Sequence, residues 1–589
     1  MSSFLVVWDR AGVGIPDSVR AIAGVRRAAA SASEPRRIER EGVIAWHWPG
    51  RWAPGSEEAL PLDHAGWTGS GVVRLDDREA LTGALLDASG PGATDDATLA
   101  WRSFAAWGDR AAGRWLGDYA LAAVSPARDR LLVARGVTGV RACFHTAIGA
   151  LECVSDDLAL LTRLRPRGGG VPTDAVAEYL CHGQLVSSTL TFHRGVMRVP
   201  AAHTLLVMRD GTHRLSRHWE HPTPAPRPGR SEEEVAEEFH EVLGRAVRDR
   251  LRAPKTALLL SGGLDSPALA VTARRVAPEV GIHAFTVSWS RLLADPEEGF
   301  ARQVAERLGL ALEVIERSPE EGLGSSAPFT TPEPMPAVEP GLWRNQSALL
   351  AARAPVVLNG EGADAILRPT PLLTQIGAEG LGRTASAWRA YRRAFGARPW
   401  IGLRASLGLQ GRAQRSHSGS APTWLRPEVA ERVPVKPAPR VKHPREEAVR
   451  ALLDPTWDAA CWLDDPVMSG ADVVVLLPFM DPRVIRFCFS LPVVPWSQRK
   501  FLLRRAMRGH LPDAVLERPK SPLRGYDEAR VRTWRALGAP APLPAPVQEW
   551  VDLDAWRHAL AHQGHARGVC AAWRVNELSR WLAQPDAVS

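Results

Sequence analysis

The feature that most constrains this fold is an alternation of apolar runs and helix-like segments that begins near residue 256. Four runs have the length and composition of strands: TALLLS (256–261), IHAFTVSW (282–289), LEVIE (312–316) and PVVLN (355–359). Segments of helical period separate them, at 267–277, 297–308 and 342–353. Strands that are apolar along both faces are typical of parallel sheets with helices on both sides. The second half of the chain is therefore expected to form a parallel α/β domain.

The first 220 residues have a different pattern, in which short apolar runs are separated by turns. These runs are FLVVW (4–8), GVIAWHW (42–48), GVVRL (71–75), YALAAV (119–124) and RLLVA (130–134). The pair Asp210-Gly211, between HTLLVM and HRLSRHW, is a strong hairpin signal. This half is expected to be a layered domain rich in antiparallel strands.

A proline-rich stretch, HPTPAPRPGR (221–230), is expected to link the two halves. Directly after it, Ser231 and Glu234 have the spacing of a capping box, which predicts a helix to about Arg252. The expected organisation is a first domain over 1–220 and a second over 231–589, with a helical insertion at about 371–470.

Composition excludes several classes of protein. No apolar stretch approaches the roughly 18 to 20 residues that span a bilayer. The start, MSSFLVVWDR, lacks the basic region of a signal peptide, so we expect a cytoplasmic protein without membrane insertion. The six cysteines are scattered without CxxC pairs, and we expect them to be reduced and buried. The net charge of +8 suits an anionic partner, but the arginines are dispersed and do not indicate nucleic acid.

Ser261, Gly262, Gly263, Asp265 and Ser266 follow the first strand of the second half. Ligands of open parallel sheets lie beyond the carboxyl ends of the strands, where glycine-rich backbone and a helix N-terminus bind anions. The segment lacks the GK[ST] of a P-loop. It resembles the pyrophosphate-binding loop of the PP-loop ATP pyrophosphatases, which split ATP between the α and β phosphates and adenylate a substrate. A plain turn from strand to helix is the alternative.

The segment LNGEGADA (358–365) follows another predicted strand and again contains two glycines. Asp364 is expected to face Asp265 across the cleft. Two carboxylates beside a pyrophosphate require a hard cation between them, which indicates Mg²⁺. In the alternative, Asp364 only caps a local turn.

Four segments occur in the order and spacing of the synthetase domain of the asparagine synthetase family: SGGLDS, GEGAD, PFMDPRVIRFCFSLP (478–492) and QRKFLLRRAMRGHLPDAVLERPKSPL (498–523). The chain resembles that domain over roughly 231–525. WGDRAAGRWLGDYALAAVSPARDRLLVARGVTGV (107–140) resembles that family's N-terminal nucleophile (Ntn) glutaminase domain. The resemblance implies an Ntn-hydrolase-like αββα sandwich followed by a PP-loop ATP pyrophosphatase domain, adenine nucleotide α-hydrolase-like, that uses ATP and Mg²⁺.

The resemblance also implies roles for two lysines. Lys520 corresponds to the lysine that stabilises charge on pyrophosphate and on the tetrahedral acyl intermediate, and Lys500 to a lysine that contacts phosphate. Preorganised cations of this kind are often the largest catalytic contribution. A surface lysine without such a role is the alternative for each.

The sequence departs from asparagine synthetases in two places that bear on function. Ser2 stands where a glutaminase needs cysteine, and glutamine-recognition segments are not apparent, so the first domain is expected to be a degenerate glutaminase. Ser2 as a surviving nucleophile is the alternative. Glu361 occupies the position of a catalytic tyrosine in β-lactam synthetases, and both a general base and a structural hydrogen bond remain open for it.

These departures make the chain most similar to lasso peptide cyclases. Those enzymes adenylate an Asp or Glu side chain of a precursor peptide and form a macrolactam with its N-terminal amine. The resemblance implies a precursor peptide as substrate, with a leader-binding protein and a leader peptidase as partners. The alternatives are a β-lactam-type or ammonia-dependent synthetase acting on a small molecule, an RNA-modifying PP-loop enzyme, and a scaffold without catalysis.

Overall fold

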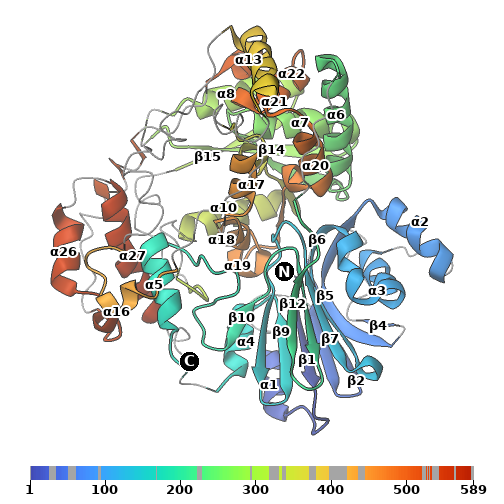
Figure 1. Cartoon of the computed structure of the whole chain (residues 1–589), viewed down its shortest axis with the longest axis vertical. Coiled ribbons are helices and arrows are strands. Elements are labelled where there is room, and N and C mark those ends of the chain that lie inside the picture. Colours follow the sequence, from blue (N-terminus) through green and yellow to red (C-terminus); the bar gives the residue numbers. More distant parts are fainter. Residues whose placement is uncertain are drawn as a thin grey trace.

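The fold is taken from a computed structural model of the whole chain. The structure describes residues 2–25, 35–50, 62–64, 66–89, 95–166, 169–221, 229–291, 293, 295–317, 330–334, 340–370, 380–396, 421–434, 445–454, 456–519, 525–526, 528–529, 531–532, 543–562 and 566–584. Figure 1 shows a β-sandwich beside a separate α/β unit, with a smaller group of helices set apart from both.

The first half forms two six-stranded antiparallel sheets packed face to face. Sheet A has the order β10-β8-β9-β1-β3-β2, formed by β1 (Ser3–Asp9), β2 (Arg36–Arg40), β3 (Val43–Trp48), β8 (Phe144–Ile148), β9 (Leu151–Ser155) and β10 (Val196–Arg198). Sheet B has the order β12-β11-β7-β6-β5-β4, formed by β4 (Leu62–His64), β5 (Trp67–Asp76), β6 (Leu116–Ser125), β7 (Arg130–Arg135), β11 (His203–Met208) and β12 (His213–Arg217). The predicted hairpin at Asp210-Gly211 is confirmed as the β11–β12 turn.

Strand β1 explains why this half is a four-layer structure. Its alternate residues Phe4, Val6 and Trp8 enter the core between the sheets, and Leu5 and Val7 enter a second core on the outer face. Helices α1 (Asp17–Val25) and α4 (Leu158–Leu164) cover that outer face, and α2 (Arg78–Ser89) and α3 (Asp96–Trp107) cover sheet B. The predicted αββα sandwich is confirmed.

The second half contains the predicted parallel sheet. Its strands are β13 (Lys255–Leu259), β14 (Gly281–Ser288), β15 (Ala311–Glu316), β16 (Val356–Leu358) and β17 (Val474–Leu476), in the order β15-β14-β13-β16-β17. All four neighbouring pairs are parallel. Chain order reverses between β13 and β16, and a crevice opens at such a point beyond the carboxyl ends of the strands.

Helices cover both faces of this sheet, as its apolar strands require. They include α6 (Glu232–Arg248), α7 (Asp265–Val276), α8 (Glu297–Leu308) and α10 (Pro340–Arg353). The capping box of Ser231 and Glu234 is confirmed, because each side chain accepts the other's backbone N–H. The helix ends at Arg248, four residues before the predicted end, since residues 249–254 turn into β13.

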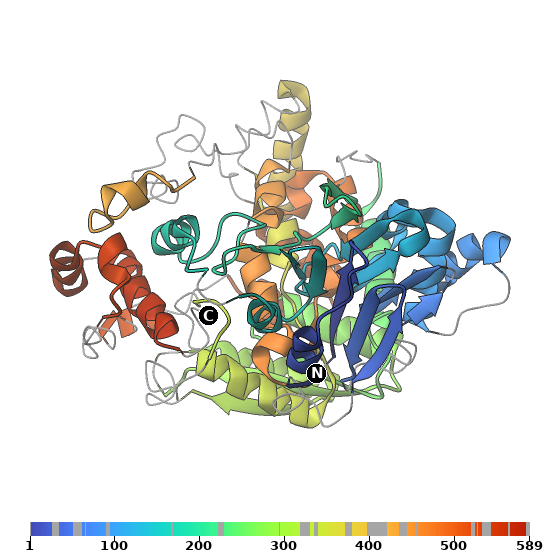
Figure 2. The same cartoon turned by 90° about the horizontal axis from the view of Figure 1, so that it is seen from below.

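A third apolar core lies apart from the two sheets. It joins α5 (Thr173–His182), α16 (Pro427–Ala430), α25 (Val547–Trp550), α26 (Leu553–His562) and α27 (Ala566–Leu582). In Figures 1 and 2, α5 from the first half lies beside the C-terminal helices α26 and α27. Trp424, Trp556, Trp573 and Trp581 are buried here, and we call this group the helical unit.

A buried ion network fastens the sandwich to the α/β unit. Arg250, two residues after the end of α6, places one guanidinium nitrogen 3.1 Å from Asp76 and 2.8 Å from Asp481. Asp76 belongs to sheet B, and Asp481 caps α20 (Pro482–Ser490) in the α/β unit. All three side chains are at most 1% exposed, so the sandwich is held in a defined position beside the parallel sheet.

The structure bears on two expectations from composition, which concern the cysteines and membrane-spanning segments. None of the six cysteines forms a disulfide within the described part of the chain, but Cys181 and Cys570, both in the helical unit, are partly exposed rather than buried. Within the part of the chain that the structure describes, no helix combines the length and apolar character needed to cross a bilayer.

Candidate active site

Two loops meet in the crevice between β13 and β16. Ser261–Ser266 follows β13, and Gly360–Asp364 follows β16. The loops touch directly, because a Cβ atom on Gly360 would lie 2.7 Å from the backbone nitrogen of Ser266. Only glycine allows that approach, so the second loop is a wall of the site formed by the first.

The Ser261–Ser266 loop is shaped by its own two serines. The Ser261 N–H donates to the Ser266 hydroxyl at 2.8 Å, and the Gly263 N–H donates to the Ser261 hydroxyl at 3.2 Å. Helix α7 begins at Asp265, earlier than the predicted Pro267, so Asp265 and Ser266 lie in its first turn. The positive end of the helix dipole therefore points into the crevice.

Lys500 lies between the two aspartates that the sequence pairs. Its ammonium is 2.5 Å from Asp265 Oδ2 and 2.7 Å from Asp364 Oδ1. Asp364 lies on α11 (Ala363–Ile366), a single turn of helix, rather than at the strand end where the sequence analysis placed it. Because one ammonium reaches both carboxylates, the two aspartates converge on one point.

The same carboxylates are a suitable donor set for Mg²⁺, which prefers oxygen ligands from one or two acidic side chains together with substrate phosphates. Asp265 is 20% exposed and Asp364 is 54% exposed, so a metal–phosphate group can reach both from solvent. Asp265 and Asp364 would hold the ion in place of the Lys500 ammonium that lies between them, and their role as metal ligands stays a prediction.

Arg518 and Glu297 hold the backbone of the Ser261–Ser266 loop through hydrogen bonds to Gly262. The sequence analysis did not predict this contact. The Gly262 N–H donates to Glu297 at 3.2 Å, and Arg518 donates to the Gly262 carbonyl at 2.7 Å. Arg518 also donates to Glu297 at 2.9 Å and lies 4.5 Å from the centre of the Phe300 ring. No sequence signal connects these residues, since Arg518 follows Gly262 by 256 positions.

Lys520, the predicted transition-state lysine, lies outside the described residues. Its predicted role therefore remains a prediction from the resemblance.

Glu361 is an exposed residue of the second loop, directly after Gly360. Its N–H donates to Asn359 Oδ1 at 3.1 Å. Water reaches its carboxyl, which is exposed, but the surrounding walls desolvate the group enough to raise its pKa. A carboxylate with a raised pKa is a stronger base, so the environment suits the general-base role left open for this residue.

Asp464 faces Glu361, and the sequence analysis missed this acidic pair. Asp464 is 8% exposed. Burial, followed by the charges of Glu361 and Asp465, raises its pKa well above the ordinary value. Asp464 therefore keeps its proton to a higher pH than an ordinary aspartate does.

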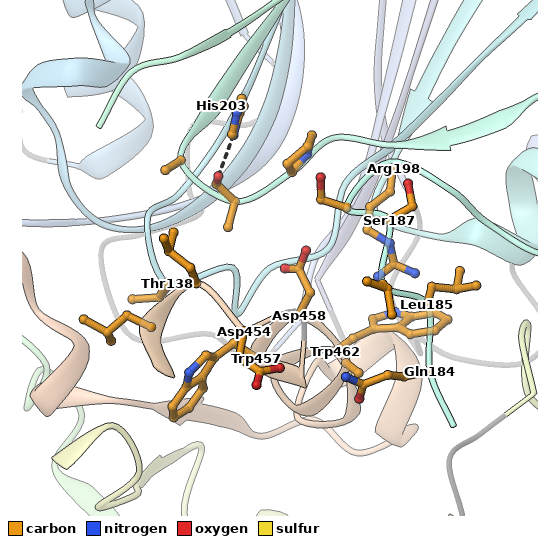
Figure 3. A pocket seen from close by; sticks show the side chains of 18 of the residues that line it. Thr138, Gln184, Leu185, Ser187, Arg198, His203, Asp454, Trp457, Asp458 and Trp462 are labelled. Carbon is orange, nitrogen blue, oxygen red and sulfur yellow. Dashed lines mark hydrogen bonds between the residues drawn. The ribbon is translucent and has the colours of Figure 1, made fainter. Parts of the chain in front are cut away.

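A cavity of about 530 Å³ lies where the sandwich, the α/β unit and the helical unit meet. Helix α18 (Thr456–Leu463) forms one wall with Trp457, Asp458 and Trp462, as Figure 3 shows. Met480 also lines the cavity and packs against the second loop, since a Cβ on Gly362 would lie 2.8 Å from its sulfur. The cavity therefore adjoins the back of the loop that carries Glu361 and Asp364.

The cavity has charges of both signs and aromatic surface. Arg198 and Glu333 form an ion pair at 2.8 Å on one side, and Asp458 lies on the other, 3.1 Å from Arg135. The Arg198 guanidinium lies over Trp462 at 4.9 Å from the ring centre. Such a lining can bind a ligand that has both polar backbone and apolar side chains.

Ser2 does not lie in this cavity or in the crevice. It is 3% exposed at the start of β1, and its hydroxyl accepts the Gly50 N–H at 3.0 Å. The hydroxyl is therefore buried and already engaged in a hydrogen bond.

Two protein families match this chain. The asparagine synthase family matches residues 238–583, which is more than half of the chain, and the glutamine amidotransferase domain family matches residues 91–219. Amidase chyE of Penicillium rubens and amidase chry2 of Gibberella zeae are each 26% identical over 268 residues, which is 42% of this chain and 39% of each relative. The chain thus spans about two fifths of the length of these curated relatives.

Solved structures give a weak likeness that carries no argument about the fold. The allosteric regulatory enzyme of purine biosynthesis is 10% identical with a TM-score of 0.26, and the likeness covers 56% of this chain and 82% of that one. Glutamine phosphoribosylpyrophosphate amidotransferase from B. subtilis is 12% identical with a TM-score of 0.26, covering 57% and 84%.

Proposed function

The chain belongs to the asparagine synthase family of ATP-dependent, amide-forming enzymes, and we propose that it closes a macrolactam ring in a precursor peptide, as lasso peptide cyclases do. An Asp or Glu carboxylate of the peptide attacks the α-phosphorus of ATP, which forms an acyl adenylate and releases pyrophosphate. The N-terminal amine of the same peptide then attacks the acyl carbon. AMP leaves, an isopeptide bond forms, and the amine loses a proton.

In this proposal the crevice binds the nucleotide. The Ser261–Ser266 loop and the N-terminus of α7 bind the pyrophosphate portion, and Lys500 neutralises phosphate charge beside it. Mg²⁺ held by Asp265 and Asp364 would offset the negative charge of the phosphates. Lys520 would stabilise the acyl intermediate, and Glu361 would accept the proton from the attacking amine.

The observation that carries the peptide assignment is the cavity beside the second loop. Its volume of about 530 Å³ lies within the roughly 300–1,000 Å³ range of pockets for sizeable ligands, and far exceeds what ammonia needs. Trp457 and Trp462 offer apolar contact, and Arg198 and Asp458 offer polar contact. The peptide's tail would be held there while its acyl group lies in the crevice, which supplies the positioning that ring closure requires.

Two further observations support an amine that comes from the substrate. Ser2 replaces the glutaminase cysteine, and its hydroxyl is buried and bonded to Gly50, so the sandwich has no free thiol at that position for releasing ammonia. The name amidase, given to the two fungal relatives, also denotes chemistry at an amide bond.

The test is to combine the purified chain with a leaderless candidate peptide, ATP and Mg²⁺. The expected product has lost the mass of one water per peptide, with one AMP released per ring. Lys520→Ala should abolish both. Lys255→Ala is the matched control, since this exposed lysine lies at the opposite, amino end of β13.

Two results would overturn the proposal. Neither water loss nor AMP release, with the candidate leader-binding protein and leader peptidase also supplied, would contradict cyclase activity. AMP release on adding a free amino acid without any peptide would instead indicate a small-molecule synthetase, either of the β-lactam type or one that uses ammonia.

A further inference from the structure

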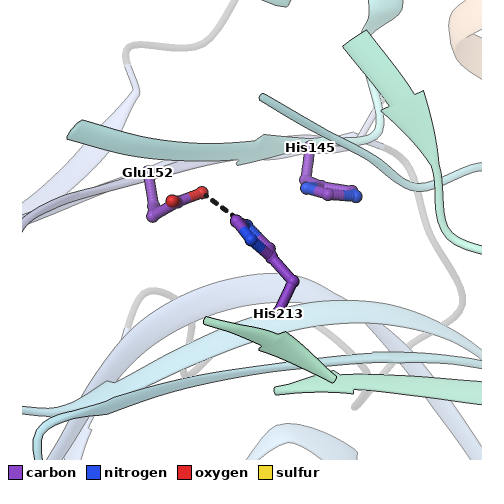
Figure 4. Close-up of side chains that lie close together, drawn as sticks. All are labelled: His145, Glu152 and His213. Atoms are coloured by element: carbon purple, nitrogen blue, oxygen red, sulfur yellow. Dashed lines mark hydrogen bonds and ion pairs between the residues drawn. The ribbon is translucent and has the colours of Figure 1, made fainter. Parts of the chain in front are cut away.

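Three potential metal ligands meet at one end of the sandwich. His145 lies on β8, Glu152 on β9 and His213 on β12, and Figure 4 shows their side chains converging between the two sheets. Their ligand atoms all lie within 4.8 Å of one another. Glu152 Oε2 is 3.4 Å from His213 Nε2, and the two imidazole rings are 5.5 Å apart.

This cluster is separate from the position of the Ntn nucleophile. Glu152 is paired with Trp8 at the far end of β1, and Ser2 precedes the near end. Ser2 and Trp8 are six residue steps apart along the strand, or roughly 20 Å at about 3.3 Å per residue. The cluster also belongs to the sandwich alone, and the crevice belongs to the parallel sheet.

Two imidazoles and one carboxylate are a donor set that suits zinc, with a fourth position left for water. Metal–ligand bonds of about 2.0–2.1 Å in a tetrahedron place ligand atoms about 3.3–3.4 Å apart. The 3.4 Å separation of Glu152 and His213 already has that value. The other two edges of the triangle, from His145 to Glu152 and to His213, are at most 4.8 Å.

The surroundings of the three side chains suit a bound ion. His145 Nδ1 is buried and has no hydrogen-bond partner among the described residues. Arg10 lies 3.3 Å from Glu152 Oε1 and orients the carboxylate, which leaves Oε2 toward His213. The His213 side chain is 36% exposed, which gives an ion access from solvent.

We infer that His145, Glu152 and His213 form a binding site for a divalent transition metal ion, with Zn²⁺ preferred. The three ligands come from both sheets of the sandwich. His145 and Glu152 belong to sheet A, and His213 belongs to β12, the exposed edge strand of sheet B. A bound ion would tie that edge strand to the opposite sheet.

The test uses full-length protein without an affinity tag, from which metal has been removed with a chelator. Its Zn²⁺ affinity is measured in competition with a chromophoric chelator. A separate titration with Co²⁺ records the visible spectrum. All proteins in this test carry His562→Ala, because His558 and His562 stack on α26 and can bind metal themselves. We expect one equivalent to bind with a dissociation constant below about 1 µM. Co²⁺ should give the intense visible bands of a tetrahedral site, and Zn²⁺ should raise the melting temperature.

His213→Ala and His145→Ala should each weaken Zn²⁺ affinity by about 100-fold or more, since loss even of a residue that supports a ligand costs 10- to 100-fold. His283→Ala is the matched control. His283 contacts Glu313 at 3.3 Å, and Arg353 contacts the same carboxylate, but the described surroundings place no second imidazole there. Equal affinity of wild type and His213→Ala would overturn the inference, and His213 is exposed enough for that variant to fold.

Discussion

The ammonium of Lys500 lies 2.5 Å from the carboxylate of Asp265, although 235 positions separate the two residues in the chain. Lys500 has a left-handed backbone conformation with a φ of +55°, just before α22 (Phe501–Ala506). This turn directs its side chain toward the first turn of α7. The Ser261–Ser266 loop, which has no lysine of its own, thus receives one from a distant segment.

Lys500→Ala should weaken binding of Mg²⁺–ATP by roughly 10- to 100-fold, because a charge-assisted hydrogen bond contributes about 1.5–3 kcal/mol. Isothermal titration with a non-hydrolysable ATP analogue and Mg²⁺ measures this. Lys255→Ala should bind as the wild type does. Unchanged affinity of Lys500→Ala would remove Lys500 from the nucleotide site.

Arg518→Ala should raise the KM for ATP about tenfold or more. The substitution removes the guanidinium that donates hydrogen bonds to the Gly262 carbonyl and to Glu297. Arg518→Lys should not restore the wild-type value, since an ammonium lacks the planar fork that reaches both acceptors. The matched control is Arg302→Ala, whose side chain is exposed on α8 and pairs with Glu298. Full rescue by lysine would show that charge alone matters at this position.

Glu361→Gln should lower kcat for ring closure by about 10²- to 10⁴-fold, if the carboxylate accepts the amine proton. Because the pKa of Glu361 is raised, the wild-type rate should increase with pH as the group loses its proton, above the range of an ordinary glutamate. The glutamine variant should lack this acidic limb. Glu306→Gln, exposed on α8, should keep it. A limb that persists in Glu361→Gln would favour the structural role.

Arg250→Ala should reduce the free energy of unfolding by about 3–5 kcal/mol, since it leaves Asp76 and Asp481 buried without this cation. The midpoint of urea denaturation measures the change, and Arg245→Ala, exposed on the same helix, is the control. Burial acts to raise the pKa of Asp481, but Arg250 and Arg483 outweigh it and lower the pKa. This contribution to stability should therefore be lost as the pH falls below the ordinary range of aspartate. Equal midpoints for both variants would contradict the proposed importance of the network.

Local patterns predicted most of the elements. The 297–308 helix has its predicted bounds, and the β11–β12 hairpin follows from Asp210-Gly211. Strand β17 was not predicted, because three residues, Val474–Leu476, become a strand only by pairing with β16. The helical unit was missed for a related reason, since α5 and α27 share a core although nearly 400 positions lie between them.

Some residues of the candidate site could be predicted from the sequence pattern, and others could not. The meeting of Asp265 and Asp364 follows from parallel strands whose carboxyl ends lie at one edge, which the apolar pattern already indicates. Glu297, Arg518 and Asp464 carry no such signal. Each contributes through packing against a loop far away in the chain, and side chains of the same types are common on any surface.

The sequence by itself determined what depends on neighbours along the chain: the period of the apolar residues, the capping of α6, the glycines at 262 and 360, and the replacement of a cysteine by Ser2. Only the tertiary structure decided which strands lie side by side, and therefore that Lys500 reaches Asp265, that Asp464 faces Glu361, and that two histidines and a glutamate meet across the sandwich. The physical reason is that burial, electrostatic pairing and ligand geometry depend on contacts between segments that are distant in the sequence. Local propensity depends only on neighbouring residues, so it does not identify those partners.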